Sequence, residues 1–453
     1  MSNSQLSTTG RAKGPPGLPV FGNLLSYLPR KLQYLRECAD RYGAVVRLHL
    51  GEPTWLLNNA EDVHHVLIVN ASNYQKTRRL TSQRGKRLSG NGLLTSSGTE
   101  HVKQRRLLQP HFTKQTSETF CSLVQEETRR LAKSWLQKQQ VDVCREMECL
   151  AKSVILRAIF GDDFNDHGGA LANAIDARRR YIEYFNLSLL PFRDKLPTRV
   201  VREYRAAERL SHKTIDRELR ARSGSTDPPR CMLARFASAT YQDGLSMTPE
   251  QVRDEVLTLM STGYETIGDG LTWCWYLLSR HESEESRMVE EVKRVCQQNE
   301  PGLGDLDDLK YTRMVFDESL RLYPPTWIYV RMAEDDDVLP SGTQIRAGDK
   351  IYLCQYIVHR NPNYYSDPHQ FNPENFNDAA IANRPKFSFF PFGGGPRVCI
   401  GEPLARMEAI LVLASLSRQF KLRCVDPNAV QLHPGITLRP KGGLLMSVES
   451  RSN

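Results

Sequence analysis

One cysteine, Cys399, lies within FGGGPRVCIG (residues 392–401), where four glycines fall within nine residues. A cysteine in such a stretch acts as a nucleophile, binds a metal or fills the core. A nucleophilic cysteine requires a paired histidine, and none lies close in sequence. Glycines let backbone N–H groups turn toward a sulfur atom, and Gly401 lets a flat group approach it, so the stretch favours a metal-binding thiolate. The positive N-terminal end of the helix expected after Cys399 also favours the thiolate form of the cysteine. No second protein ligand is evident, which predicts that a macrocycle supplies the others.

The segment STGYETIGDG (residues 261–270) combines an acid and a hydroxyl, Glu265 and Thr266, with three glycines. It interrupts a long helix that we expect to begin after an N-cap at Thr248 and to extend to about residue 280. An interior glycine costs about 1 kcal/mol relative to alanine, so the cluster predicts a local opening of the helix. Beside such an opening, Glu265 and Thr266 can relay protons. Close helix packing over small residues is the alternative explanation.

Two further pairs of side chains share helix faces. Glu318 and Arg321, in ESLR, lie three residues apart in an apolar helix ended by two prolines, which predicts a buried pair rather than a surface ion pair. His101 and Arg105 lie four residues apart, and both can donate to a carboxylate. A solvated basic helix with a structural histidine is the alternative for the second pair.

Helices dominate the elements that must position these residues. Helical periodicity extends from about residue 100 to residue 325 and returns after Cys399. Short segments at 45–50, 54–60, 326–358 and 436–450 have strand character. The sequence therefore predicts a mainly α fold with a small β portion built from both ends of the chain. We expect a disordered tail at residues 1–13 and a single domain at residues 14–453.

Composition excludes several classes of protein. The 453 residues carry a net charge of +9, but no block of five basic residues stands out, so we expect a basic solvated surface and no nucleic-acid binding. The ten cysteines form no CxxC pair, which predicts reduced, mostly buried thiols. The N-terminus has no apolar segment and later apolar runs are short. We therefore expect no membrane anchor and a cytoplasmic location.

These motifs together resemble the cytochrome P450 family of haem-thiolate monooxygenases. The match to the family's cysteine motif comprises Phe392, Gly395, Arg397, Cys399 and Gly401. TGYETI resembles the oxygen-activating helix segment, ESLR the structural ExxR, HVKQR a helix that holds a haem propionate, and PPTWIYVR a strand with a further propionate-binding arginine. Their order and spacing agree with the family from about residue 14 onward.

The resemblance implies a triangular, helix-rich single domain that encloses haem b, with Cys399 as the axial ligand of the iron. It implies that Glu265 and Thr266 deliver protons while dioxygen is activated, and that Glu318 and Arg321 are structural. The residues implied to contact the haem are His101, Arg105, Arg331, Phe392, Arg397 and Gly401.

Three residues depart from the family pattern. His101 occupies a position where tryptophan is more common. Asn375, in FNPENF, stands where an arginine commonly completes a triad with Glu318 and Arg321. Thr262 replaces a small apolar residue, so its hydroxyl either adds a polar group to the pocket or bonds back to the preceding turn.

Motif position also implies a substrate pocket with a mostly aliphatic lining. This lining implies a lipophilic small molecule (a terpenoid, a fatty acid or a polyketide) that is hydroxylated or epoxidised with dioxygen. The residues implied to line the pocket are Leu94, Thr262, Gly263, Thr326, Ile328 and Ile436.

The chain contains no recognisable flavin or iron–sulfur domain. We therefore expect a monomer that receives electrons from a separate ferredoxin or flavodoxin with its reductase, which docks near Lys103 and Arg106. The alternatives are a peroxide-driven or rearranging haem-thiolate enzyme, a non-catalytic haem-binding sensor and, less in keeping with the motifs, a cysteine hydrolase.

Overall fold

The computed structural model describes residues 13–83, 85–86, 90–161, 164, 169–186, 196–222 and 231–451. All but the last residue of the expected disordered tail lie outside the described residues. The chain divides into two compact units: unit 1 combines residues up to Thr77 with Leu320–Cys399, and unit 2 combines Arg78–Ser319 with the residues from Ile400 onward. The domain expected at residues 14–453 includes residues of both units.

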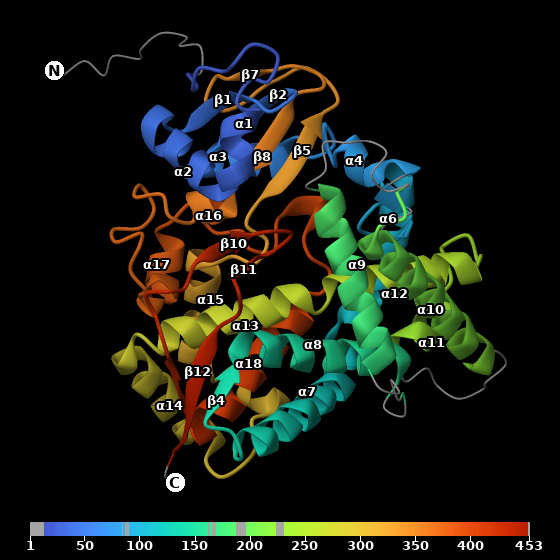
Figure 1. The fold of residues 1–453 in the computed structure, drawn as a ribbon, viewed down its shortest axis with the longest axis vertical. Coiled ribbons are helices and arrows are strands. Elements are labelled where there is room, and N and C mark those ends of the chain that lie inside the picture. Colours follow the sequence, from blue (N-terminus) through green and yellow to red (C-terminus); the bar gives the residue numbers. More distant parts are fainter. Residues whose placement is uncertain are drawn as a thin grey trace. The chain divides into compact units, whose positions relative to one another are not determined.

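A five-stranded β-sheet organises unit 1 (Figure 1). Its strand order is β1-β2-β8-β5-β3, and the β2–β8 pair is parallel whereas the other pairs are antiparallel. The early and late strand segments expected from the sequence therefore meet in one sheet. The strands of unit 1 are β1 (Val45–His49), β2 (Pro53–Leu57), β3 (Tyr74–Gln75), β5 (Tyr329–Ala333) and β8 (Lys350–Leu353), with a separate hairpin of β6 (Asp337–Val338) and β7 (Gln344–Ile345).

The hydrophobic core of unit 1 lies between this sheet and short helices. Leu57 and Ile351 from the sheet are fully buried, and Val66 and Leu67 pack with them from the helical side. Phe387 belongs to the same cluster and precedes the cysteine motif by five residues, so the core anchors the start of that motif. The helical elements are α1 (Leu24–Tyr27), η1 (Leu28–Arg30), α2 (Lys31–Tyr42), α3 (Ala60–His64), η2 (His65–Val69), α16 (Gln355–Val358), η7 (Pro373–Phe376), α17 (Asp378–Ala382), η8 (Lys386–Ser388) and η9 (Gly395–Arg397).

Unit 2 is built mainly from helices, as the periodicity predicts. Figure 1 shows α13 beside α8 and α18, and the contacts between these helices agree. The helices are α4 (Arg78–Thr81), α6 (Gly98–Leu108), η3 (Gln109–Phe112), α7 (Lys114–Trp135), α8 (Val143–Phe160), α9 (Ala170–Asn186), α10 (Arg199–Arg222), α11 (Met232–Ala237), α12 (Pro249–Thr262), α13 (Glu265–Leu278), α14 (Glu282–Cys296), η6 (Leu303–Asp305) and α18 (Glu402–Gln419); α15 (Lys310–Leu322) ends in unit 1. The strands are β4 (Gln140–Asp142), β9 (Phe420–Cys424), β10 (Leu432–Pro434), β11 (Leu438–Pro440) and β12 (Leu445–Ser450).

Two helices form the centre of unit 2. Helix α18 is buried continuously from Met407 to Ser417, and α13 is buried along its length except at Thr266. A helical stretch that is mostly apolar on every face is typically buried in a core, which agrees with the contacts of α18 with α7, α13 and α14. The exception at Thr266 places a half-buried hydroxyl on an otherwise buried helix.

The helix expected from Thr248 onward begins as the sequence predicts. The Thr248 hydroxyl accepts from the backbone N–H of Gln251, and the Gln251 side chain accepts from the backbone N–H of Thr248. The expected interruption is also present: α12 ends at Thr262 and α13 begins at Glu265. The prediction of a helix with a local opening is therefore confirmed.

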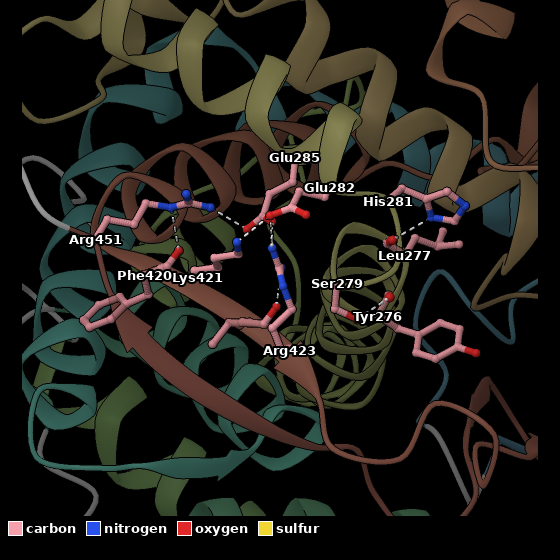
Figure 2. Close-up of polar contacts among 11 residues, drawn as sticks. Tyr276, Leu277, Ser279, His281, Glu282, Glu285, Phe420, Lys421, Arg423 and Arg451 are labelled. Carbon is pink, nitrogen blue, oxygen red and sulfur yellow. Dashed lines mark hydrogen bonds and ion pairs between the residues drawn. The ribbon is translucent and has the colours of Figure 1, made fainter.

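An ion-pair cluster joins α14 to the C-terminal strands (Figure 2). Glu285 is 2% exposed and pairs with Arg423 at 2.7 Å and with Arg451. Glu282, one helical turn earlier, pairs with Lys421 and Arg423 at the more exposed end of the cluster. Two guanidinium groups thus share one buried carboxylate, which holds the end of the chain against α14.

Candidate active site

The cysteine motif forms a tight loop at the end of unit 1. The backbone N–H of Cys399 donates to the carbonyl of Phe392 at 2.9 Å, and that of Val398 donates to the carbonyl of Gly395 at 3.1 Å. These bonds turn the chain so that Cys399 is exposed.

All ten cysteines are free, and six of them are buried, so the prediction of reduced and mostly buried thiols is confirmed.

The glycines of this loop occupy positions where a larger residue is disfavoured by the backbone conformation or by neighbouring atoms. Gly393 and Gly395 have φ values of +78° and +68°, a region that L side chains rarely adopt. A Cβ atom on Gly395 would lie 2.0 Å from the carbonyl oxygen of Leu67, and one on Gly394 would lie 2.6 Å from the ring of Phe387. The loop is therefore pressed against the core of unit 1, and no larger residue fits at these positions without displacing it.

Three basic side chains, Lys76, Arg331 and Arg397, lie next to this loop. Arg331 on β5 is 7% exposed, and burial lowers the pKa of its guanidinium. Burial and then repulsion from Arg331 lower the pKa of Arg397 to about 10. Burial and then repulsion from Arg397 and Arg331 lower the pKa of Lys76 to about 6. Bringing a negative charge next to these three side chains would offset the repulsion and favour the charged form of Lys76, so this group of residues is suited to bind an anionic ligand.

The position of Lys76 follows from the sheet. In the β3–β5 pair, Tyr74 lies opposite Ala333 and Gln75 opposite Met332. Lys76 directly follows β3, and continuing this register brings it opposite Arg331. Sequence reasoning identified Arg331 but missed Lys76, because a two-residue strand leaves no periodic pattern from which the register can be read.

In unit 2, the opening between α12 and α13 lies against α8. A Cβ atom on Gly263 would lie 2.9 Å from the side chain of Ile155, and one on Gly268 would lie 3.1 Å from Cα of Glu148. The alternative explanation of the glycines, close packing over small residues, is therefore also correct. The opening and the packing occur together in one segment.

The hydroxyl groups of this segment bond to the preceding helical turn. The Thr262 hydroxyl donates to the carbonyl of Thr258 at 2.8 Å, and the Thr266 hydroxyl donates to the carbonyl of Thr262 at 3.3 Å. Of the two alternatives for Thr262, the structure thus shows the bond back to the preceding turn. Thr262, Gly263 and Thr266 are each half-buried.

The Glu265 carboxyl points toward the C-terminal strands of unit 2. It is 6% exposed and accepts a hydrogen bond of 2.7 Å from the hydroxyl of Thr437. Burial raises its pKa to about 7, against the opposing effects of the Thr437 hydrogen bond and of Arg179. A carboxyl with a pKa near neutrality can both accept and release a proton at physiological pH, which is what a relay requires.

The two side chains of the predicted pair on α6, His101 and Arg105, differ in how far they are buried. His101 is 4% exposed, whereas Arg105 is half-buried and its Nε donates to Gln109 at 3.4 Å. The loop before α6 is fixed to α12, because the backbone N–H of Leu93 donates to Glu255 at 2.9 Å. This bond places the half-buried Leu94 beside α12. Sequence reasoning missed Glu255, which is a buried acid in an ordinary helical pattern.

Glu318 and Arg321 are both 0% exposed, as expected for the ExxR motif. Within unit 1, Arg321 donates to the carbonyls of His359 at 3.0 Å and of Pro368 at 2.8 Å, and its guanidinium lies 4.6 Å from the ring centre of Tyr365. Arg384 stacks on the same ring at 4.6 Å. A second guanidinium is therefore present next to Tyr365, although it comes from a residue that the motif did not indicate.

The remaining expected site residues lie in both units. Thr326 and Ile328 in unit 1 are half-buried just before β5. Ile436 in unit 2 is 37% exposed and precedes Thr437 in the turn before β11. The indole N–H of Trp273 donates to the carbonyl of Leu438 at 2.7 Å, so α13 holds this turn in place. Gly401 is the N-cap of α18.

A comparison with protein families decides the identity of the fold. The family model described as "Cytochrome P450" matches residues 12–446, which is nearly the whole chain. The chain is a cytochrome P450. A solved structure, the crystal structure of a cytochrome P450DA heme domain, superimposes with a TM-score of 0.86 over 98% of each chain at 23% identity, so the expected P450 fold is confirmed.

Relatives from Streptomyces show which P450s are similar in sequence. Cyclooctatin synthase of Streptomyces melanosporofaciens is 31% identical, with 96% of this chain and 95% of the relative covered. Cyclooctat-9-en-7-ol 5-monooxygenase of the same species is 29% identical (95% and 91% covered), and pentalenene oxygenase of Streptomyces avermitilis is 28% identical (92% and 92% covered). The protein is therefore a P450 monooxygenase, and no helix among its described residues is long and apolar enough to cross a membrane.

The residues of unit 1 fit the haem-thiolate cofactor that the family carries. The exposed thiol of Cys399 lies on a loop shaped by glycines, which suits a ligand to a metal in a flat macrocycle. The guanidinium groups of Arg331 and Arg397, together with Lys76, which an adjacent anion would hold in its charged form, could pair with the two propionates of a haem. Both the available sulfur ligand and the basic side chains next to it therefore fit a haem-thiolate cofactor.

Proposed function

We propose that this P450 inserts one oxygen atom from dioxygen into a terpenoid, using electrons from a separate ferredoxin or flavodoxin. The observation that supports dioxygen activation is the acid at the helix opening: Glu265 is buried, has a pKa near 7 and directly precedes the half-buried Thr266. A peroxide-driven enzyme or a haem sensor has no need of such a proton source.

Each candidate residue has a distinct role in this proposal. Cys399 ligates the iron of haem b, and Arg331, Arg397 and Lys76 bind propionate. His101 and Arg105 keep the propionate-binding role that their motif implies. When bound, the haem supplies the reduction and activation of dioxygen. The carboxyl of Glu265 releases a proton to the hydroxyl oxygen Oγ1 of Thr266, and this hydroxyl releases its own proton toward the pocket. Glu265 then regains a proton from within the protein.

The substrate class is proposed from the pocket and from the relatives. The expected lining of Leu94, Thr262, Gly263, Thr326, Ile328 and Ile436 is mostly aliphatic, and the hydroxyl of Thr262 is already bonded to Thr258. A pocket of this kind favours a hydrophobic substrate with few polar groups. The names of two relatives specify pentalenene and cyclooctat-9-en-7-ol, an olefin and an unsaturated alcohol, as substrates. Among the lipophilic classes considered, these names favour a terpenoid.

Haem binding through Cys399 is tested by an absorption spectrum of the reduced protein bound to carbon monoxide. We expect the band of a thiolate-ligated haem in the wild type and in Cys149→Ser, and its loss in Cys399→Ser. Cys149 is the matched control because it is the other exposed cysteine. A thiolate spectrum in Cys399→Ser would refute the assignment of the ligand.

The reaction and the substrate class are tested separately. Thr266→Ala is expected to divert dioxygen consumption from product to hydrogen peroxide; turnover with added peroxide that is insensitive to this change would favour the peroxide-driven alternative. Titration of the haem spin state with terpene olefins, terpene alcohols and fatty acids of similar size should give the tightest binding for the terpenes. Tighter binding of the fatty acids would overturn the substrate proposal.

A further inference from the structure

The π-helical turn η2 supports the cysteine loop from within unit 1. The backbone N–H of Asn70 donates to the carbonyl of His65 at 2.9 Å, so this bond reaches one residue further than the bonds of an α-helix. Leu67 lies inside the turn, and its carbonyl oxygen is the atom that a Cβ on Gly395 would meet at 2.0 Å. Turns of this kind are rare and occur frequently at functional sites. The position of the cysteine loop therefore depends on what holds η2.

A single carboxylate oxygen holds both ends of this turn. Oδ2 of Asp337 is hydrogen-bonded to Nε2 of His65 at 2.8 Å and accepts from Nδ2 of Asn70 at 3.0 Å. His65 and Asn70 are also the two residues whose backbone groups close the turn. The hydroxyl of Tyr74 donates to the same oxygen at 2.7 Å. The Asp337 carboxylate therefore ties η2 to the start of β3.

Asp337 is ionised in this network. Burial opposes its ionisation, but the hydrogen bonds from Tyr74, His65 and Asn70 bring the pKa of the carboxyl below its usual value. An ionised carboxylate can only accept, so Nε2 of His65 carries the hydrogen of its bond to Asp337. Hydrogen bonds to a charged acceptor are roughly twice as strong as those between neutral groups. The charge of Asp337 thus strengthens all three bonds.

The core of unit 1 holds Asp337 itself in place. Asp337 lies on β6 and pairs with Ile345 on β7. Ile345 and Leu339 are each 1% exposed, and both belong to the hydrophobic cluster that contains Leu67. The side chains of Asp337 and His65 are each 15% exposed, so water has little access to the bond between them. The β6–β7 hairpin therefore fixes the carboxylate against η2.

The same carboxylate is connected to a second part of the proposed haem site. Tyr74 is the first residue of β3, and Lys76 directly follows this strand. Lys76 is one of the basic side chains next to the cysteine loop. Through Tyr74 the carboxylate holds the strand that leads to Lys76, and through the two ends of η2 it holds the support of Gly395.

We propose that Asp337 is a positioning residue for the haem-thiolate site: its carboxylate fixes η2, and η2 in turn fixes the loop on which Cys399 binds the iron. Without the carboxylate, the two side chains at the ends of the π turn lose their shared acceptor. The Leu67 carbonyl that lies against Gly395 then shifts, and the loop holds the thiolate less firmly. This proposal rests on the proposed role of Cys399 as the iron ligand and extends it to a residue outside the family motifs.

Asp337→Asn tests the proposal, with Asp349→Asn as the matched control. Asp349 is also a buried carboxylate of unit 1 that accepts from an aromatic side chain, but its bonds go to Nε1 of Trp55 at 2.8 Å and to the backbone N–H of Arg346 at 3.0 Å. Urea unfolding should show a loss of stability in both variants. Transfer of haem to apomyoglobin should be about tenfold faster from Asp337→Asn than from the wild type, because removing an outer partner of a metal ligand typically has an effect of this size.

The spectrum of the reduced protein bound to carbon monoxide gives a second measurement on the same variants. The thiolate-type band of Asp337→Asn should change to the thiol type faster than that of the wild type, whereas Asp349→Asn should keep the wild-type spectrum and transfer rate. If Asp337→Asn fails to fold, Tyr74→Phe removes one donor and keeps the ring, and should change both measurements less but in the same direction. His65→Gln, whose amide N–H can replace the imidazole donor, should stay closer to the wild type than His65→Leu.

The outcomes separate this proposal from the proposed function. Equal haem transfer and equal spectra in Asp337→Asn and Asp349→Asn would show that the carboxylate does not position the loop, and the role of Cys399 would stand. Wild-type behaviour of both Tyr74→Phe and His65→Leu would overturn the proposal in the same way. A wild-type protein that lacks the thiolate-type band would instead refute the role of Cys399, and with it the proposed function.

Discussion

Replacing Gly395 by alanine should damage the cysteine loop far more than an ordinary glycine substitution. Gly395 has a φ of +68°, and its Cβ would lie 2.0 Å from the carbonyl oxygen of Leu67. Gly342, in the turn of the β6–β7 hairpin, has a φ of +79° but no atom within 4 Å of the position of a Cβ. The two glycines share the backbone conformation and differ in the space around them, so Gly342→Ala is a matched control.

The magnitude follows from these two contributions. A non-glycine residue in the left-handed region costs about 1–2 kcal/mol, and this is the whole effect expected for Gly342→Ala. At Gly395 the new methyl group must move by about 1 Å or more from the Leu67 carbonyl to reach an ordinary contact distance. Overpacking of this kind costs about 1–3 kcal/mol in addition. We therefore expect Gly395→Ala to lose about 2–5 kcal/mol.

Urea unfolding of both variants measures the difference, and the spectrum of the reduced protein bound to carbon monoxide measures its effect on the ligand. Gly395→Ala should shift the loop and lose part of its thiolate-type spectrum, whereas Gly342→Ala should keep the spectrum unchanged. Equal losses of unfolding free energy in the two variants, together with an intact spectrum for Gly395→Ala, would refute the steric argument.

Three further predictions concern other parts of the molecule. Burial raises the pKa of the Glu408 carboxyl to about 8 from an ordinary 4.5, so Glu408 stays protonated in the folded state and the unfolding free energy should fall as pH rises from 4.5 to 8. The fall is at most about 5 kcal/mol, and it should be smaller in Glu408→Gln. The same pH dependence of urea unfolding in the wild type and in Glu408→Gln would contradict this prediction. Glu285→Gln removes the carboxylate shared by Arg423 and Arg451 and should cost about 2 kcal/mol, since both arginines are partly exposed, whereas Glu290→Gln on the exposed face of α14 should cost little in the same assay. Reversing the exposed charges at Lys103 and Arg106 should slow reduction by an acidic ferredoxin at low salt, and unchanged stopped-flow rates would exclude this surface as the docking site.

Much of the fold is predictable because its elements have local causes. The hairpin at residues 45–57 follows from alternating hydrophobic residues, and the start of α12 from the capping pair of Thr248 and Gln251. The break before Glu265 follows from a cluster of poor helix formers. In each instance the residues that cause the element lie within a few positions of it, so a single sequence is sufficient to predict the element.

The parts that could not be predicted depend on contacts between distant segments. Lys76 joins Arg331 because β3 pairs with β5 across more than half of the chain. Thr437 reaches Glu265 because Trp273 fixes the C-terminal turn to α13. No periodicity or motif in these segments specifies such neighbours.

The parallel pairing of β2 with β8 has a consequence for the synthesis of the chain. Trp55 pairs with Ile351, so the edge of β2 that faces away from β1 is covered by β8 only after nearly 300 further residues have been translated. At about 5–20 residues per second this interval is roughly 15–60 s. During that time the edge of β2 presents unpaired backbone groups and the apolar side chains of Leu56 and Leu57 to the solvent and to other nascent chains. Slower expression, or a chaperone that binds extended segments, should therefore raise the yield of folded protein.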